Sequence, residues 1–279
     1  MRSITIIGFG YVGRAMARFF DGKYKVHVYD PYIGDDKYLN EFKDYTFISS
    51  GEPMRPTDLA VVCVPTAMRE DGSCDTSIAS QTIEMLGKEV LILVKSTVPP
   101  RFTQKYIDEG YQIAFSPEYL GESSYTTHWW KGDPDPTNLK THDFQIFGGD
   151  KKITSRIIPF FRSIMGPQTK YLQTDATTAE MAKYMENCFF ATKVTFCNEF
   201  YNIAKTFGVD YNELRELWLN DGHINRNHTL VFDEKRGYGG KCYPKDMAAI
   251  IKASSDAGHE PMLLKAVVAL NDVIKTNQK

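Results

Sequence analysis

The sequence predicts an α/β protein, with a helix-covered sheet in the first half of the chain and an all-helical second half. Three features support this fold class. Short apolar runs alternate with helical patterns up to about residue 150, the first run leads into a glycine-rich turn, and a helical pattern of about 35 residues begins near residue 174. Strands that alternate with helices are typical of βαβ units and hence of a parallel sheet.

The predicted strands are short apolar runs bounded by Gly, Pro or polar residues. They lack the period-2 alternation of a half-exposed strand, so we expect both faces to be buried between helical layers, as in a parallel sheet. The segment 127–143 is predicted as a loop, because its Pro, Asp and Lys residues cannot continue a helix or a central strand. The strands are residues 3–8, 25–30, 59–65, 89–96, 111–116 and, as the last strand of the domain, 143–149.

A long helical run opens the second half of the chain. Residues 174–208 contain no proline, begin with the N-cap candidates Thr174 and Asp175, and end at Gly208. A helix of this length is typical of a domain connection or a subunit interface.

Two further helical segments are expected, around residues 210–220 and from Pro244 to about Ile274. We therefore predict two domains, residues 1–172 with the sheet and residues 173–279 with the helices. A length of 279 residues accommodates two domains of ordinary size.

Charge and hydropathy exclude several classes of partner. The formal net charge of -2 argues against a dedicated nucleic-acid surface, which would concentrate Lys and Arg. No basic leader precedes the first strand, and no apolar run reaches the roughly 20 residues needed to span a bilayer. We expect a cytoplasmic protein with neither a nucleic acid nor a membrane as partner.

Five cysteines are present, an odd number without any C-x-x-C pair. Neither a disulfide framework nor a zinc site is indicated, no metal is expected, and a reducing compartment fits best. The cysteines are Cys63, Cys74, Cys188, Cys197 and Cys242.

The first strand is followed by Gly8, Gly10 and Gly13 in G-x-G-x-x-G spacing, at the start of a predicted helix, and the second strand ends at Asp30. In a Rossmann domain the glycines permit a tight turn and close approach of a pyrophosphate, the helix N-terminus donates N–H groups, and the acidic residue accepts from a ribose hydroxyl. Asp30 would repel a 2′-phosphate, which favours NAD over NADP. The alternatives are an ordinary glycine turn and a flavin site, but the context favours NAD.

Cys242 lies in the stretch GYGGKCYPKD, on a turn among charged residues. Glycines at 237, 239 and 240 allow a ligand close to the backbone, and Lys241 and Lys245 can lower the pKa of the thiol. Asp246 can orient a lysine or a water. The alternative is a structural cysteine that packs as a small apolar residue.

Two other clusters are candidates for chemistry. Lys183 and Asn187 are four residues apart on the long helix and can stabilise an oxyanion together, although a solvated helix face is the alternative. Glu118 and Glu122 follow a predicted strand, at the sheet edge where open α/β proteins bind ligands. Either carboxylate can act as a base, or be an ordinary surface acid.

The chain resembles the UDP-glucose/GDP-mannose dehydrogenase family. The resemblance covers nearly the whole chain and rests on blocks that occur in the family's order and spacing. These are GFGYVG at 8–13, VPT at 64–66, DGSCDTS at 71–77, KSTVPP at 95–100, SPEYLGES at 116–123, AEMAKYMEN at 179–187 and GYGGKCYPKD at 237–246.

The resemblance implies two NAD-dependent oxidations that convert the primary alcohol of a nucleotide sugar to a carboxylate, with UDP-glucose as the default substrate. Cys242 would capture the aldehyde as a thiohemiacetal, which is then oxidised to a thioester and hydrolysed. Lys183 and Asn187 would stabilise oxyanions, and Asp246 with Thr97 would hold a water. Glu122 would be the base for hydrolysis, with Glu118 as its electrostatic partner.

The resemblance also implies the residues that contact the ligands. Arg226 would reach the substrate in a neighbouring subunit's site, which implies a homodimer. The cofactor residues would be Gly8, Gly10, Tyr11, Val12, Gly13, Asp30, Pro65, Thr66, Ser96 and Thr97. The substrate residues would be Tyr119, Leu120, Glu122, Lys183, Arg226, Tyr238, Gly239 and Lys245.

One departure from the family pattern and two alternative functions stay open. Family members usually continue into a third domain that helps to bind the nucleotide, whereas this sequence stops at Lys279. A truncated chain, a short form whose partner completes the site, and an enzyme for a smaller substrate are the three alternatives. A β-hydroxyacid dehydrogenase, which also has a Lys-x-x-x-Asn helix but needs one hydride transfer and no nucleophilic cysteine, is the main alternative. The other is a non-catalytic NAD-binding subunit.

Overall fold

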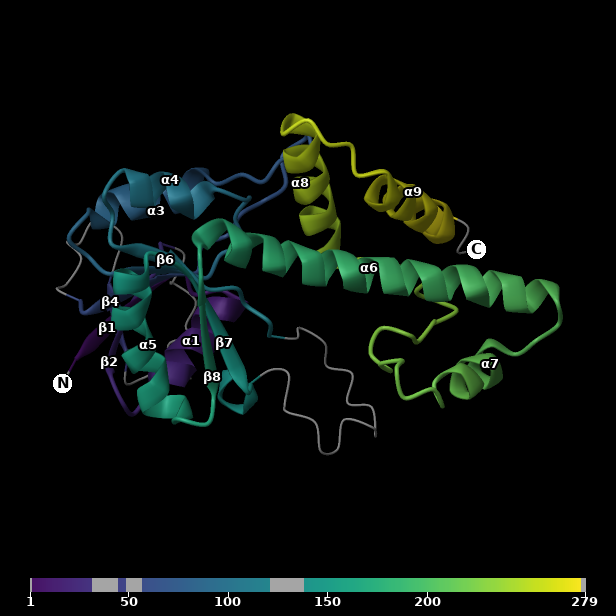
Figure 1. Ribbon diagram of the computed structural model, residues 1–279, viewed down its shortest axis with the longest axis horizontal. Coiled ribbons are helices and arrows are strands. Elements are labelled where there is room, and N and C mark those ends of the chain that lie inside the picture. Colours follow the sequence, from purple (N-terminus) through teal and green to yellow (C-terminus); the bar gives the residue numbers. More distant parts are fainter. Residues whose placement is uncertain (1, 32–44, 49–56, 121–137, 277–279) are drawn as a thin grey trace. The chain divides into compact units, whose positions relative to one another are not determined.

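A computed structural model of the chain describes residues 2–31, 45–48, 57–120 and 138–276 (Figure 1). The chain forms two compact units, which are described separately. The first comprises Met1–Ala67 and Asp75–Lys183, and the second comprises Met68–Cys74 and Tyr184–Lys279. The predicted domains, 1–172 and 173–279, stay a prediction.

The first unit is built on a sheet whose strand order is β3-β2-β1-β4-β5-β6-β7-β8. The order reverses between β1 and β4, as in a doubly wound Rossmann sheet, and the predicted α/β class is confirmed. The strands are β1 (Ser3–Ile7), β2 (Lys25–Tyr29), β3 (Thr46–Ile48), β4 (Leu59–Val62), β5 (Ile92–Val94), β6 (Ile113–Phe115), β7 (Phe144–Gly149) and β8 (Lys170–Thr174).

Two details of the sheet correct the prediction. The pair β6–β7 is antiparallel, with Ala114 opposite Gly149, whereas the described pairs on either side of it are parallel. Apolar composition reveals that a strand is buried but not its direction. The last strand is β8 rather than β7, and its sequence KYLQT is mostly exposed, so it lacks the apolar run of a central strand.

Helices cover both faces of the sheet, because successive strand residues point to opposite sides. Ile4 and Ile6 pack with α1 and α5 on one face, whereas Ile7 and Val62 pack with α3 and α4 on the other. The four helices are α1 (Tyr11–Phe20), α3 (Ser77–Leu86), α4 (Phe102–Asp108) and α5 (Lys151–Met165).

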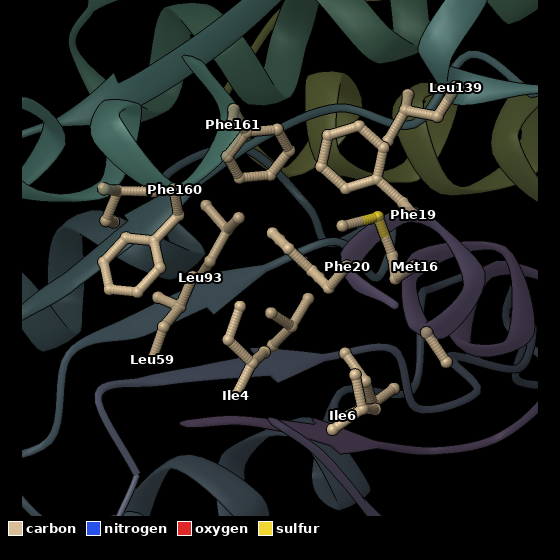
Figure 2. Packing of buried hydrophobic residues seen from close by; sticks show 14 of the residues in the cluster. Ile4, Ile6, Met16, Phe19, Phe20, Leu59, Leu93, Leu139, Phe160 and Phe161 are labelled. Carbon is tan, nitrogen blue, oxygen red and sulfur yellow. The ribbon is translucent and has the colours of Figure 1, made fainter. Parts of the chain in front are cut away.

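Aromatic rings fill the core between the sheet and helices α1 and α5 (Figure 2). The ring of Phe161 lies 5.3 Å from that of Phe19 and 5.4 Å from that of Phe20, between centroids. Complete burial of such a side chain contributes roughly 1.5–3 kcal/mol. The aromatic packing therefore anchors α1, whose N-terminus follows the glycine turn, against the sheet.

The long helix α6 (Ala176–Thr206) confirms the predicted helical run. Asp175 caps its N-terminus by accepting a hydrogen bond from the Thr178 N–H at 2.8 Å. Residues 138–143 of the predicted loop are described and include the short 3-10 helix Leu139–Thr141, while the rest of that loop lies outside the described residues.

The remaining helices of the second unit are α7 (Tyr211–Trp218), α8 (Tyr243–Asp256) and α9 (Met262–Thr276). The prediction of one helical segment from Pro244 to about Ile274 is wrong, because Gly258, with φ of 90°, and Pro261 separate α8 from α9. Within the described parts of the chain, no helix is long and apolar enough to cross a membrane.

Candidate active site

The glycine turn between β1 and α1 has the geometry of a pyrophosphate-binding loop. A Cβ on Gly8, whose φ is 87°, would lie 2.6 Å from the Cys63 carbonyl oxygen, and a Cβ on Gly13 would lie 1.9 Å from the Gly8 carbonyl oxygen. Among the residues that the structure describes, none has an atom within 4 Å of the position of a Cβ on Gly10, the N-cap residue of α1, apart from its chain neighbours. Two glycines therefore serve chain packing, and the third leaves room for a ligand at the helix N-terminus.

Asp30 lies at the end of β2 and points back to this turn. Its Oδ2 accepts a hydrogen bond from the Phe9 N–H at 2.6 Å, so the carboxylate also fixes the conformation of the glycine turn. A carboxylate at this position fits a ribose hydroxyl and disfavours a 2′-phosphate. The residues present fit NAD.

Four other predicted cofactor residues follow β4 and β5, at the same edge of the sheet. The Thr66 hydroxyl donates to the Thr97 carbonyl at 2.7 Å, and the Ser96 hydroxyl donates to the Val64 carbonyl at 2.7 Å. These bonds tie the end of β4 to the end of β5, and with Pro65 they form one wall of this edge.

Lys95 and Glu118 form a buried ion pair at the ends of β5 and β6. The distance between Lys95 Nζ and Glu118 Oε2 is 3.1 Å, and the two side chains are 0% and 8% exposed. Lys95 also donates to the Pro117 carbonyl at 3.0 Å, while Glu118 Oε1 accepts from the N–H groups of Tyr119 and Leu120 at 3.0 and 3.1 Å. The pair fixes the backbone of the segment that follows β6.

Lys95 is a residue that sequence reasoning missed. The sequence contains a signal for it, because Lys95 directly follows the apolar run LILV. A lysine at the end of a buried strand is expected to be buried itself and to require a charged partner. Glu118 was predicted and lies in this cluster. Glu122 lies outside the described residues, so its predicted role stays a prediction.

Lys183, on α6 within the first unit, lies over the ring of Tyr119, with 5.1 Å from Nζ to the ring centroid. The geometry is that of a cation–π contact. The Tyr119 backbone is in turn held by Glu118. The structure thus brings together three predicted site residues, Lys183, Tyr119 and Glu118.

In the second unit, Cys242 is the N-cap residue of α8, with Pro244 in the first turn. Its carbonyl accepts the helical hydrogen bond from the Asp246 N–H at 2.9 Å, and the residue is partly exposed. The N-terminus of a helix favours a thiolate over a thiol. The sequence leads to this geometry because glycines precede the cysteine and a proline follows it.

Asp246 is 1% exposed and lies between two of the predicted residues. One carboxylate oxygen accepts from Asn187 Nδ2 at 2.5 Å, and the other pairs with Lys245 Nζ at 2.6 Å. The second unit thus brings Asn187 of α6 against Lys245 and Asp246, which lie in the first turn of the helix that Cys242 begins. Thr97 belongs to the first unit, and its predicted water shared with Asp246 stays a prediction.

Other cysteines have the environment of inert thiols. Burial, followed by the nearby Asp246 carboxylate, raises the pKa of Cys188 to about 12. Burial also raises the pKa of Cys63 and of Cys197 above the ordinary range. Cys242 differs from all three in its place at a helix N-terminus, and it is also more exposed than the buried Cys188 and Cys197.

Comparisons with known proteins agree with this geometry. Residues 23–133 match the NAD binding domain of the UDP-glucose/GDP-mannose dehydrogenase family, and residues 177–273 match its central domain. The chain belongs to this family. It is therefore a member of a family of NAD-dependent nucleotide-sugar dehydrogenases, and its N-terminal part is the family's NAD-binding domain.

Several named relatives are similar over nearly the whole of this chain. UDP-glucose 6-dehydrogenase AglM of Haloferax volcanii is 29% identical over 96% of the chain and 69% of that protein. UDP-glucose 6-dehydrogenase of Pseudomonas aeruginosa is 27% identical over 96% of the chain and 65% of that protein. YwqF of Bacillus subtilis, also a UDP-glucose 6-dehydrogenase, is matched over only 48% of its length. The chain thus spans about half to two thirds of these relatives.

Solved structures show the same fold. A UDP-glucose dehydrogenase from Pyrobaculum islandicum has a TM-score of 0.78 and 26% identity, over 98% of this chain and 68% of that one. A UDP-D-ManNAc dehydrogenase from Pyrococcus horikoshii has a TM-score of 0.79 at 23% identity, over 98% of this chain and 69% of that one. The second likeness concerns the fold alone.

The other residues that the family resemblance singled out lie mainly in the second unit. Arg226 Nη2 donates to both carboxylate oxygens of Glu216, at 2.7 and 2.6 Å, so the guanidinium is paired within its own chain. Tyr238 is buried, and Gly239 follows it in the loop before Cys242. Tyr11 and Val12 begin α1 in the first unit, and Leu120 contributes its N–H to Glu118. The roles of these residues in binding stay predictions.

Proposed function

We propose that the chain oxidises the primary alcohol of a nucleotide sugar to the carboxylate in two NAD-dependent steps, with Cys242 as the nucleophile. Membership of the family supports the reaction class. The observation that carries the role of the cysteine is its place at the N-terminus of α8, where the first turn also holds Asp246 between Asn187 and Lys245. UDP-glucose is the first substrate to test, because relatives named above act on it.

Bound NAD would accept a hydride in each of the two oxidations. Gly10 and the N-terminus of α1 would hold its pyrophosphate, and Asp30 would accept from its adenosine ribose. Thr66 and Ser96 donate their hydroxyl protons to backbone carbonyls, so these side chains shape the edge of the site.

The cysteine explains how one site can perform both oxidations. The first oxidation removes a hydride and a proton from the alcohol and leaves an aldehyde. Attack by the Cys242 thiolate forms a carbon–sulfur bond and, once the oxygen takes up a proton, gives a thiohemiacetal. Loss of a second hydride together with the hydroxyl proton converts the thiohemiacetal to a thioester. Water then cleaves the carbon–sulfur bond and releases the carboxylate and the thiolate. Two NAD and one water are consumed for each sugar.

The polar side chains have distinct roles in this scheme. Lys183 supplies positive charge for the oxygen that becomes negative, and Asn187 can donate a hydrogen bond to the same kind of oxygen. Asp246 fixes the Asn187 amide and the Lys245 ammonium by direct contact. Glu118, held by Lys95, provides a fixed negative charge at the end of β6. Thr97 and Glu122 would contribute a bound water and a base, as the resemblance implies.

We further propose that the protein is a homodimer formed through α6. Exposed apolar side chains follow one another at spacings of three, four or seven residues along this helix, which is the pattern of a helix–helix interface. These residues are Met185, Phe189, Phe196, Phe200 and Ile203, with exposed fractions of 40–78%, and Phe207, 79% exposed, directly follows the helix. A second copy can cover the stripe with the same stripe, as a two-fold interface requires.

The absence of any disulfide among the described cysteines fits a cytoplasmic location.

The deciding experiment counts NADH formed per molecule of UDP-glucose, with GDP-mannose and UDP-N-acetyl sugars in parallel. Native protein is expected to form two NADH per sugar, and Cys242→Ser to lose turnover or stop at the aldehyde. Cys74→Ser, which changes a buried cysteine, is the matched control. One NADH per sugar, insensitive to the loss of Cys242, would favour the β-hydroxyacid dehydrogenase alternative. NAD binding without turnover on any sugar would favour a non-catalytic subunit.

A further inference from the structure

The loop before Cys242 is held by a buried asparagine of α9. Asn271 is 4% exposed, and its side-chain amide bonds both polar groups of the Tyr238 backbone. Its Oδ1 accepts from the Tyr238 N–H at 2.8 Å, and its Nδ2 donates to the Tyr238 carbonyl at 3.2 Å. Without these partners the buried N–H and carbonyl of Tyr238 would be unsatisfied, which is costly in a protein interior. One side chain thus replaces the secondary structure that this loop lacks.

A second buried asparagine holds the same loop from α6. Asn198 is 1% exposed, and its Oδ1 accepts from the Gly237 N–H at 3.1 Å and from Arg236 Nε at 2.7 Å. Its Nδ2 donates to the Val194 carbonyl of α6 at 2.9 Å. The helix backbone therefore orients the amide, and the amide in turn orients the loop.

Arg236 strengthens the attachment to α6. Its Nη2 donates to the Asn198 carbonyl at 3.0 Å and to Asn202 Oδ1 at 2.9 Å. The guanidinium lies over the Tyr201 ring, 4.1 Å from its centroid. Hydrogen bonds and stacking together fix the start of the loop to two turns of α6.

Gly237 is the residue that permits this close contact. Its φ is 70°, a left-handed conformation, and a Cβ at this position would lie 2.5 Å from Asn271 Oδ1. The loop and the asparagine are therefore matched to each other, because any larger side chain would push them apart.

We propose that Asn198 and Asn271 are positioning residues for the Cys242 thiol. Three residues, two of them glycines, separate Tyr238 from Cys242. Glycines restrict the chain least, so a loop that is free at Tyr238 would leave the entry into α8 undefined. Attachment to α6 and α9 fixes the point at which the chain enters α8, and it keeps the thiol at the N-terminus of that helix. The inference rests on the proposed nucleophilic role of Cys242 and deepens it.

The position of the thiol has a measurable chemical consequence. A thiol at a helix N-terminus is more acidic than an ordinary cysteine, whose pKa is about 8.5. If the loop loses its attachment, the first turn of α8 frays and this stabilisation of the thiolate is lost. The reactivity of Cys242 therefore depends on two side chains that are distant from it in the sequence and lie on two other helices of the unit.

The test measures the rate at which iodoacetamide alkylates Cys242 as a function of pH, with peptide mass spectrometry to separate this cysteine from the other four. Asn271→Leu removes both hydrogen bonds to Tyr238, and Gly237→Ala disturbs the same contact from the loop. Both variants are expected to react about tenfold more slowly near neutral pH, with the inflection of the rate moved to higher pH, as a rise of about one unit in the thiol pKa requires. Asn220→Ala removes an exposed amide that bonds the Glu216 carbonyl at 2.8 Å, and it should leave the rate unchanged.

A folded variant whose Cys242 reacts at the native rate and with the native pH inflection would overturn the proposal. Circular dichroism and urea unfolding establish that each variant is folded, and Gly237→Ala decides the question if Asn271→Leu is not. Alkylation needs neither NAD nor a sugar. If the variants are alkylated slowly but the native protein oxidises no nucleotide sugar, the proposed function alone is overturned. If the native protein is an active enzyme but the variants are alkylated at the native rate, this inference alone is overturned.

Discussion

The amide of Asn187 donates to the carboxylate of Asp246 at 2.5 Å, and both side chains are buried within the second unit. This hydrogen bond joins α6 to the first turn of α8, one turn from Cys242. Lys245 completes the cluster from the other side of the carboxylate, at 2.6 Å. The bond therefore links two proposed catalytic residues and also contributes to the packing of the two helices that carry them.

Replacing Asn187 and Asp246 by alanine, singly and together, should reveal strong coupling. Each single change removes this buried hydrogen bond and should lower the free energy of unfolding by about 1–3 kcal/mol. The double variant should lose less than the sum, by about 0.5–3 kcal/mol, in urea unfolding. The exposed pair Lys252–Asp256 on the same helix is the control, and its double-alanine cycle should give roughly 0–1 kcal/mol. Additive losses at Asn187 and Asp246 would show that the bond contributes nothing specific.

Removing the cation from the buried Lys95–Glu118 pair should destabilise the first unit. Lys95→Met leaves the Glu118 carboxylate buried without its counter-charge, which typically costs about 3–5 kcal/mol. The double change Lys95→Met with Glu118→Gln should recover much of this loss, because no buried charge remains. Urea unfolding checks both variants. Lys105→Met, which breaks an exposed pair with Glu109, should change the stability by less than about 1 kcal/mol, and an equally small effect at Lys95 would contradict the expectation.

The three glycines of the turn before α1 should respond differently to alanine. Gly13→Ala forces a Cβ to within 1.9 Å of the Gly8 carbonyl oxygen, so it should lower stability and NAD affinity together. The added methyl group of Gly10→Ala meets no atom within 4 Å among the described residues, so this variant should keep the native unfolding midpoint and still bind NAD more weakly. Calorimetric titration with NAD, beside thermal unfolding, separates the two effects. Native NAD affinity in Gly10→Ala would place the pyrophosphate elsewhere.

Much of the first unit was predictable from the sequence because its central strands are buried on both faces. Continuous apolar runs such as LAVV mark these strands whatever their neighbours are. The edge strand β8 was missed because its residues are exposed or only partly buried and it has no continuous apolar run, and β3 has only three residues. The break between α8 and α9 was signalled by Gly258 and Pro261 but lay inside a stretch that otherwise has helical periodicity.

The candidate site was predictable where residues follow strands or belong to motifs, as with Gly8, Asp30, Glu118 and Cys242. Residues that act through tertiary partners were not. Asn198 and Asn271 lie far from Cys242 in the sequence, and each is an ordinary asparagine on a helix until the fold places a loop backbone against it. Lys95 became significant only because β6 carries Glu118 beside it. Sequence position alone does not encode such partners.

Glu180 of α6 gives the first unit a pH dependence that can be predicted with its sign. This carboxylate is fully buried and accepts from the N–H groups of Arg101 and Thr103, at 2.7 and 2.8 Å, at the start of α4. Burial, which outweighs these hydrogen bonds, raises the pKa of Glu180 to about 7, and the nearby Asp175 charge acts in the same direction. In the unfolded chain its pKa returns to about 4.3.

Between these two pKa values the folded protein binds more protons at Glu180 than the unfolded chain does. The free energy of unfolding should therefore fall as the pH rises from about 4.3 to about 7, by something on the order of 1–3 kcal/mol from this residue, and then level off. Glu180→Gln removes this titration. The difference in the free energy of unfolding between native protein and variant, measured by urea unfolding, should therefore shrink or reverse as the pH rises across this window. His228 acts with the opposite sign, because burial lowers its pKa to about 4 and stability is lost as the pH falls toward that value. His228 is unchanged in the variant, so its contribution cancels when the two free energies of unfolding are subtracted. A difference between native protein and variant that does not vary with pH would show that Glu180 remains ionised throughout.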